Sequence, residues 1–244
     1  MDQEKNKPGH SLSGLAFLGL ALSLAAVAVA MISGFGSRWG LWHFSTGFKI
    51  LGGAALGGGI ASLICLISLV SGLRKGLWRN FILSCIGFAL GLIVFGIPYS
   101  WYHAAKQLPR IHDIATDTEN PPRFVAIIPL RESAPTPPDY GGPEIAVKQR
   151  EAYPDIKPLI LDIPVDKVFD RALAAAQKMS WKIADVDVKQ LRIEATDTTV
   201  WFGFKNDIVI RITALDNKSR IDVRSVSRVG LSDVGTNAVR IRNI

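Results

Sequence analysis

The sequence predicts an α+β protein in which a three-helix transmembrane region precedes a soluble two-layer domain. Three long intervals within the first 105 residues contain no Asp, Glu, Lys or Arg. One amphipathic helical pattern lies near residue 170, and runs of alternating apolar and polar residues follow it. This alternation predicts an antiparallel sheet with one buried face, and the helix would be its main packing partner.

The membrane region is expected to occupy residues 1–109. Its uncharged intervals, 11–37, 50–73 and 81–105, each exceed the roughly 20 residues that cross a bilayer. We place the three helices at about 13–34, 50–72 and 80–104. The first interval is longer than the apolar core of a signal peptide, and two more follow it, so we expect an uncleaved helix.

Basic residues in the short loops predict the orientation. Lys5, Lys7, Arg74, Lys75 and Arg79 lie before the first helix and in the second loop, against Arg38 and Lys49 in the first loop. Because basic loops tend to stay in the cytoplasm, the amino terminus is expected inside and residues 110–244 outside. This pattern predicts a protein of the bacterial inner (cytoplasmic) membrane whose carboxyl-terminal domain is periplasmic, within the cell envelope.

Small residues spaced four apart recur in all three predicted helices: Ala21 and Ala25, Ala26 and Ala30, Gly53 and Gly57, Gly87 and Gly91. In lipid this spacing lets helix backbones approach closely, so membrane lipids and other membrane proteins are the expected partners. No span contains a charged residue, which disfavours a transporter or channel.

The net charge of +7 comes partly from membrane loops, and no nucleic-acid motif appears. We therefore expect contact with anionic lipid head groups and none with nucleic acid.

The soluble domain is expected to span residues 110–244. Residues 124–130 predict a short apolar strand or buried segment, and the Pro- and Gly-rich stretch 131–143 resembles a linker. Residues 164–179 predict a helix, because apolar side chains recur every three or four positions. The strands follow around 191–195, 208–212 and 221–225, and Asp216-Asn217 supplies a turn between the last two.

Catalytic motifs are absent from the sequence, so an enzyme is not favoured and no catalytic residue is assigned. His112 beside Asp113 would be an oriented base only if both pointed the same way. Oxygen ligands from Asp113, Asp117 and Glu119 have no calcium-loop spacing. Neither a metal nor a cofactor is expected, and the two cysteines, Cys65 and Cys85, fall in predicted spans.

The carboxyl end carries the strongest candidate binding site. Its candidate residues are Arg224, Ser227, Arg228, Ser232, Asp233, Asn237 and Arg240, with His112, Asp113 and Asp117 as secondary candidates. Guanidinium and hydroxyl groups near glycine-rich turns are suited to an anion or carboxylate. The alternative is structural: Arg211 and Arg224 would pair with Glu194 in a solvated ladder, and Asp233 would cap a last helix.

Four ordered stretches of the sequence resemble the domain of unknown function 1499 family: residues 113–124, 152–159, 192–212 and 221–242. The resemblance covers most of the region after Arg110. It implies a bacterial or plastid protein associated with a membrane or envelope, and it implies no catalytic residue.

Together these observations favour a membrane-anchored extracytoplasmic binding or assembly module, for which an accessory subunit of a membrane complex is one expected role. The alternative is an enzyme that acts on an anionic envelope substrate through the Arg-, Ser- and Asp-rich carboxyl-terminal motif.

Overall fold

The computed structural model describes residues 9–244, with side chains from residue 14 onward. The chain forms two compact units. The first holds the described residues up to His103 together with Trp201–Gly203, and the second holds Ala104–Val200 and Phe204–Ile244. Lys5 and Lys7, which enter the predicted orientation, lie outside the described residues.

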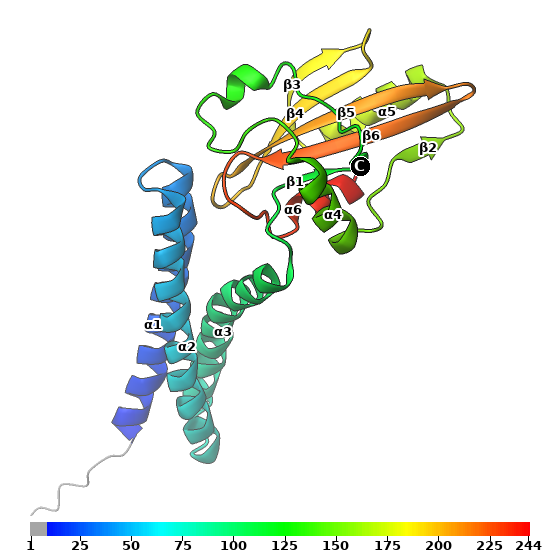
Figure 1. The fold of residues 1–244 in the computed structure, drawn as a ribbon. Coiled ribbons are helices and arrows are strands. Elements are labelled where there is room, and N and C mark those ends of the chain that lie inside the picture. Colours follow the sequence, from blue (N-terminus) through cyan, green and yellow to red (C-terminus); the bar gives the residue numbers. More distant parts are fainter. Residues whose placement is uncertain (1–8) are drawn as a thin grey trace, which may run out of the picture. The chain divides into compact units, whose positions relative to one another are not determined.

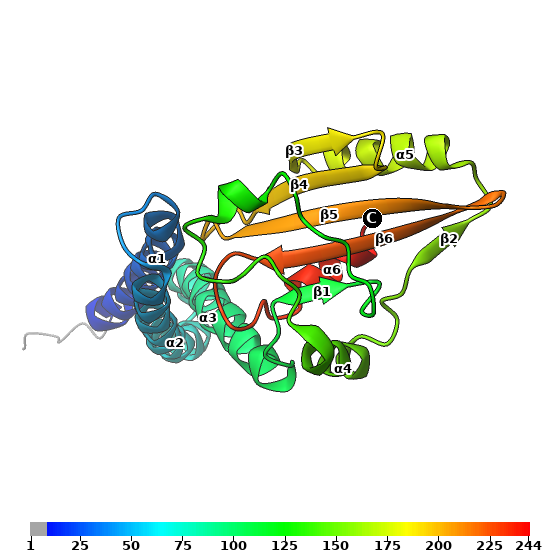
Figure 2. The ribbon, with the colours of Figure 1, turned by 45° about the horizontal axis from the view of Figure 1, so that its top comes forward.

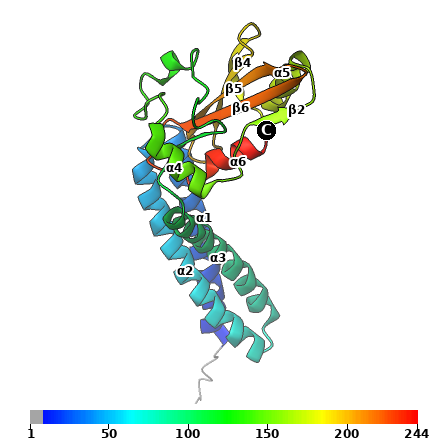
Figure 3. The same cartoon turned by 45° about the vertical axis from the view of Figure 1, so that its right-hand side comes forward.

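Three long helices form most of the first unit: α1 (Gly9–Arg38), α2 (Phe44–Arg74) and α3 (Trp78–Gln107). Within the described part of the chain, these three are the helices long and apolar enough to cross a membrane. This confirms the three predicted apolar helices. They run alongside one another in Figure 3.

Some of the small residues bring these helices together, and others do not. A Cβ added at Gly91 would lie 2.5 Å from the Gly58 carbonyl oxygen, so only glycine permits this approach. The Ser23 hydroxyl of α1 donates to the Gly87 carbonyl of α3 at 2.7 Å. By contrast, a Cβ added at Gly53 or Gly57 meets nothing within 4 Å. That part of α2 therefore remains open within this chain.

The second unit is an α+β domain, as predicted. Its elements are β1 (Asp113–Ala115), the 3₁₀ helix η1 (Ile128–Arg131), α4 (Gly142–Ala152), β2 (Leu159–Leu161), α5 (Val165–Lys178), β3 (Lys182–Asp187), β4 (Arg192–Thr198), β5 (Lys205–Leu215), β6 (Lys218–Ser227) and α6 (Thr236–Arg242). The antiparallel sheet has the order β1-β6-β5-β4-β3, and β2 also pairs with β6 (Figure 2).

The hairpin between β5 and β6 has the predicted turn. Leu215 pairs with Lys218, so Asp216 and Asn217 make a two-residue connection, and Asp216 has a φ of 48°. Short polar side chains tolerate this left-handed conformation. β1 was not predicted, because a three-residue strand is too short to show a period.

One face of the sheet packs on helices, as the amphipathic pattern predicts. The core on this face includes Val168, Phe169, Ala172, Ala176, Trp181, Ile193, Ala195, Ile208, Ile210, Ile212, Ile221, Val223, Ala238 and Ile241. The members from α5 recur at three- and four-residue steps, which places them on one side of the helix. α6 adds the last two, so two helices cover this face where one was expected.

The prediction of a single buried face is wrong, because the opposite face is also covered. We call residues 116–141 the covering segment; it crosses this face in Figure 1. Phe124 and Ile127 of the segment cluster with Val209 and Val226 of the sheet. Residues 124–130 thus form the buried segment that was one of two expectations, with η1 at the end and no strand.

Candidate functional site

The covered face of the sheet is charged rather than apolar. Alternate residues of β6 point toward the covering segment: Arg220, Asp222 and Arg224, with Arg228 just after the strand. β5 adds Asp207 and Arg211, and β4 adds Arg192 and Glu194. Several of the ion-pair partners of these arginines, such as Asp113 and Asp117, come from segments distant in the sequence.

Arg224 is the most buried of these arginines, with 2% of its surface exposed. Its Nε and Nη2 donate to the two carboxylate oxygens of Asp113 at 2.9 and 2.7 Å. The guanidinium also lies against the rings of Phe124 and Tyr140, at 5.1 and 5.5 Å from their centroids. Burial raises the pKa of Asp113, and the hydrogen bonds from Arg224 oppose this rise. The pair is internal and has no face open to a ligand.

Asp207 accepts from two arginines at once. Arg228 binds it through Nε and Nη2, each at 2.8 Å, and Arg131 of η1 donates to it at 2.5 Å. The Thr196 hydroxyl adds a fourth hydrogen bond at 2.7 Å. This cluster ties the end of η1 to β4, β5 and β6, although Arg131 begins the stretch expected to resemble a linker.

Glu194 anchors the covering segment through its backbone. Its carboxylate accepts the N–H groups of Val125, Ala126 and Ile127 at 2.9, 3.2 and 2.9 Å. Arg192 Nε lies 2.8 Å from the same carboxylate. A fully buried carboxylate is stable here because four donors surround it.

The predicted ladder of Arg211 and Arg224 with Glu194 is wrong. Arg224 pairs with Asp113, and Arg211 Nη2 donates to Asp117 at 3.1 Å and to Asp222 at 2.9 Å. Asp222 is fully buried, so these pairs are covered rather than solvated. The covering segment decides the pairing, because it brings Asp117 onto the face from a position 94 residues earlier than Arg211.

The remaining carboxyl-terminal candidates bond mostly to one another. Asn237 is buried; its Nδ2 donates to the Ser227 hydroxyl at 3.0 Å and to the His112 carbonyl at 2.8 Å. Arg240 donates to Asp197 at 2.6 Å. These contacts fasten α6 to the strands beneath it.

Asp233 and Ser232 shape the turn before α6. The Asp233 carboxylate accepts from the backbone N–H groups of Gly235 and Asn237 at 2.9 and 2.6 Å. The N-cap of α6 is Gly235 and not Asp233 as expected, so Asp233 bonds to the start of the helix from two residues before the cap. Burial raises its pKa, and these backbone hydrogen bonds oppose the rise. Ser232 accepts from the Val234 N–H at 3.2 Å.

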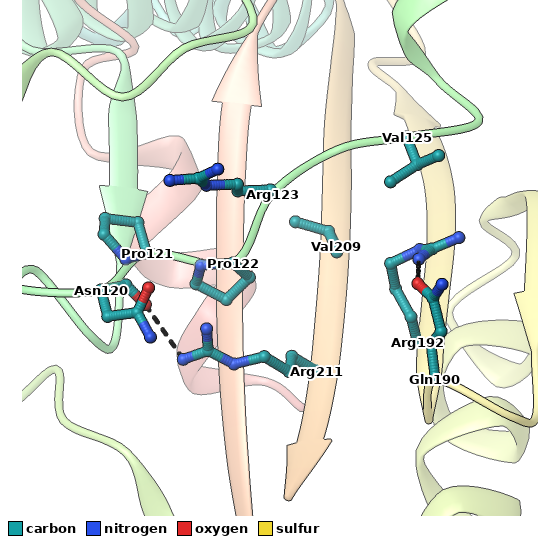
Figure 4. Close-up of a pocket in the computed structure, with 9 residues that line it drawn as sticks. All are labelled: Asn120, Pro121, Pro122, Arg123, Val125, Gln190, Arg192, Val209 and Arg211. Atoms are coloured by element: carbon teal, nitrogen blue, oxygen red, sulfur yellow. Dashed lines mark hydrogen bonds between the residues drawn. The ribbon is translucent and has the colours of Figure 1, made fainter.

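A pocket of about 240 Å³ opens on the charged face, beside the covering segment. It is lined by Asn120, Pro121, Pro122, Arg123, Val125, Gln190, Arg192, Val209 and Arg211 (Figure 4). Three of the lining residues are arginines and none is acidic. In Figure 4, Pro122 lies between the side chains of Arg123 and Arg211, with Val209, Val125 and Arg192 on the other side.

Two of these arginines retain hydrogen-bond donors for a ligand. Arg123 is exposed, and its side chain has no hydrogen bond or ion pair with any residue that the structure describes. Arg211 makes its three hydrogen bonds, to Asp117, Asn120 and Asp222, through Nη2 alone. Its Nη1 makes no hydrogen bond with the residues that the structure describes and is the donor left for a ligand. Its Nε also has no partner among these residues, but it is buried and closed to a ligand.

Arg192 differs, because its two terminal nitrogens donate to Gln190 and Asp185. Its buried Nε lies 2.8 Å from the Glu194 carboxylate as an ion pair, although it makes no hydrogen bond among the described residues. It forms a wall of the pocket rather than a source of free donors. The site that the geometry supports therefore centres on Arg123 and Arg211. Neither belonged to the predicted site: Arg123 lies in a proline-rich stretch with no motif, and Arg211 was read only as an ion-pair partner.

Comparison with protein families identifies residues 113–244 as a match to the family described as "Protein of unknown function (DUF1499)". This match covers more than half of the chain, so the protein belongs to the DUF1499 family. Neither the curated proteins nor the solved structures gave a match.

Proposed function

We propose that this protein is a membrane-anchored binding module whose pocket takes an anionic group, such as a phosphate or a carboxylate. The observation that carries the proposal is the pocket with two guanidinium groups that keep free donors and no acidic residue in its lining. Guanidinium groups bind such oxyanions through paired, charge-assisted hydrogen bonds.

The test uses the full chain in nanodiscs of zwitterionic lipid and inorganic phosphate as the probe. Isothermal titration should detect phosphate binding to the wild-type chain. Arg123→Ala should bind about tenfold more weakly, because a hydrogen bond to a charged group contributes at least about 1.5 kcal/mol. Arg171→Ala is the matched control, since Arg171 is an exposed arginine of α5 without a partner among the described residues. Equal binding by wild type and Arg123→Ala would refute the site.

The expected place of this module is the bacterial inner membrane, with the amino terminus in the cytoplasm and the domain in the periplasm. The distribution of basic loop residues supports this orientation. A single cysteine introduced at the exposed position Lys189, in a chain with Cys65 and Cys85 replaced by serine, should react with a membrane-impermeant maleimide in spheroplasts. Lys75→Cys, in the same background without other cysteines, should react only after lysis. The reverse labelling pattern would mean that the chain has the opposite orientation.

The open part of α2 supports a further partner, another membrane protein. Gly53 and Gly57 are four residues apart, and a Cβ added at either would meet none of the described residues within 4 Å, which leaves a surface where a second helix can approach closely. Affinity purification in mild detergent, with mass spectrometry of the retained proteins and lipids, should recover a stoichiometric protein with the wild type. The partner protein should no longer co-purify with Gly53→Leu. If the wild-type chain is recovered alone, the proposed assembly role is refuted.

A further inference from the structure

Three exposed apolar side chains follow one another along the covering segment, starting at the pocket. We call Val125, Ile128 and Leu130 the apolar ridge; their surfaces are 53%, 47% and 56% exposed. Val125 belongs to both features, because it also lines the pocket. Large apolar side chains that gather next to a polar site mark a binding surface more often than scattered ones do.

The backbone beneath this ridge is held in place. Phe124 and Ile127 are 5% and 0% exposed and pack on the sheet, while Glu194 accepts the N–H groups of residues 125–127. At the far end, Arg228 Nη1 donates to the Leu130 carbonyl at 2.7 Å. Buried charges and apolar contacts thus fix the segment so that its remaining apolar side chains face water.

A ligand that satisfies both features has two parts. Free guanidinium donors at Arg123 and Arg211 call for an oxyanion, and the adjoining ridge calls for an aliphatic chain whose burial removes apolar surface from water. Amphiphiles of this kind are components of membranes, and the chain is anchored by three apolar helices. The bilayer therefore supplies such ligands at high local concentration.

We infer that the pocket and the ridge together bind an anionic amphiphile, with its phosphate or carboxylate head at Arg123 and Arg211 and its alkyl chain along Val125, Ile128 and Leu130. This inference rests on the proposed anion site and names its ligand class. A free oxyanion would use the first half of the surface only.

Two water-soluble probes distinguish binding at the anion site from binding along the apolar ridge: inorganic phosphate and hexyl phosphate. Each is titrated into the full chain in zwitterionic nanodiscs, with empty nanodiscs as the blank. Hexyl phosphate should bind at least about tenfold more tightly than phosphate, a gain that two buried methylene groups supply. If both probes bind equally, the amphiphile is overturned and the anion site stands. If neither binds, both proposals fall.

Substitutions in the anion site and in the apolar ridge should change the binding of the two probes differently. Arg123→Ala should weaken both probes by about tenfold. Leu130→Ser should leave phosphate binding unchanged and remove most of the advantage of hexyl phosphate. Val147→Ser is the control, because Val147 of α4 is a comparably exposed valine, 46%, outside the pocket lining and the ridge. An unchanged hexyl advantage in Leu130→Ser and Val125→Ser would contradict the placement of the alkyl chain.

Discussion

Arg224 of β6 and Asp113 of β1 form a two-pronged ion pair, at 2.9 and 2.7 Å, inside the domain. The guanidinium also donates to the carbonyl of Pro138 at 2.7 Å, so one side chain joins the edge strand, the central sheet and the covering segment. A charged group is stable at this depth because its donors meet the Asp113 carboxylate and the carbonyls of Pro122 and Pro138.

Removing one member of this pair should destabilise the domain strongly. Arg224→Met leaves Asp113 buried without its partner, and the expected cost is about 3–5 kcal/mol. Hydrogen exchange of β6 peptides in the full chain measures it. The double variant Arg224→Met with Asp113→Leu should recover much of the protection, because both charges are then gone. A double variant less stable than either single one would contradict this account.

Glu194 should control the order of the covering segment. Glu194→Gln removes the charge that accepts three backbone N–H groups and places an amide donor among them. We expect a local loss of about 2 kcal/mol, or roughly thirtyfold faster hydrogen exchange at residues 125–127. Glu151→Gln, at an exposed acidic residue of α4, is the control. Exchange in the segment that stays at the wild-type rate in both variants would show that other contacts hold it.

Gly91 and Gly53 should respond differently to the same substitution. Gly91→Leu places a side chain against the Gly58 carbonyl, 2.5 Å from the new Cβ, and overpacking of this kind costs about 1–3 kcal/mol. At Gly53, by contrast, an added Cβ meets no atom of the described residues within 4 Å. Thermal unfolding in detergent should show a lower midpoint for Gly91→Leu alone. Equal midpoints for the two variants would argue against the close approach of α2 and α3.

Tyr140 should ionise late. Burial, together with the charge of Asp113, raises the pKa of Tyr140 to about 12 from its ordinary value near 10. Since the folded state holds the phenol proton more tightly than the unfolded state does, the stability contributed by this group is complete below about pH 10 and is lost as the pH rises toward 12.

The ultraviolet absorbance of tyrosinate measures this ionisation. A wild-type minus Tyr140→Phe difference titration should show one phenol with its midpoint near 12. Tyr140→Phe keeps the ring over Arg224 and lacks the ionisable group, so its stability should depend less on pH in the alkaline range. A difference midpoint near 10 would mean that the Tyr140 phenol is solvated.

The sequence by itself determined the three long helices, the amphipathic helix α5 and the main strands of this protein. Uncharged intervals give the three long helices because a bilayer demands about 20 apolar residues. The spacing of Val168, Phe169 and Ala172 gives α5, and alternation gives β4, β5 and β6, because local periods place side chains on one face. The sequence also sufficed to recognise the resemblance of the carboxyl-terminal region to the DUF1499 family.

Only the tertiary structure decided what covers the second face of the sheet and which arginines line the pocket. Asp113 and Arg224 are 111 residues apart in the chain, and no local pattern encodes which distant carboxylate meets which guanidinium. That choice depends on the path of the covering segment over the sheet. Along the same path, the donors of Arg224 and Arg228 form hydrogen bonds inside the domain, whereas Arg123 and Arg211 line the pocket. Which donors stay unpaired depends on the neighbours that folding brings to each side chain.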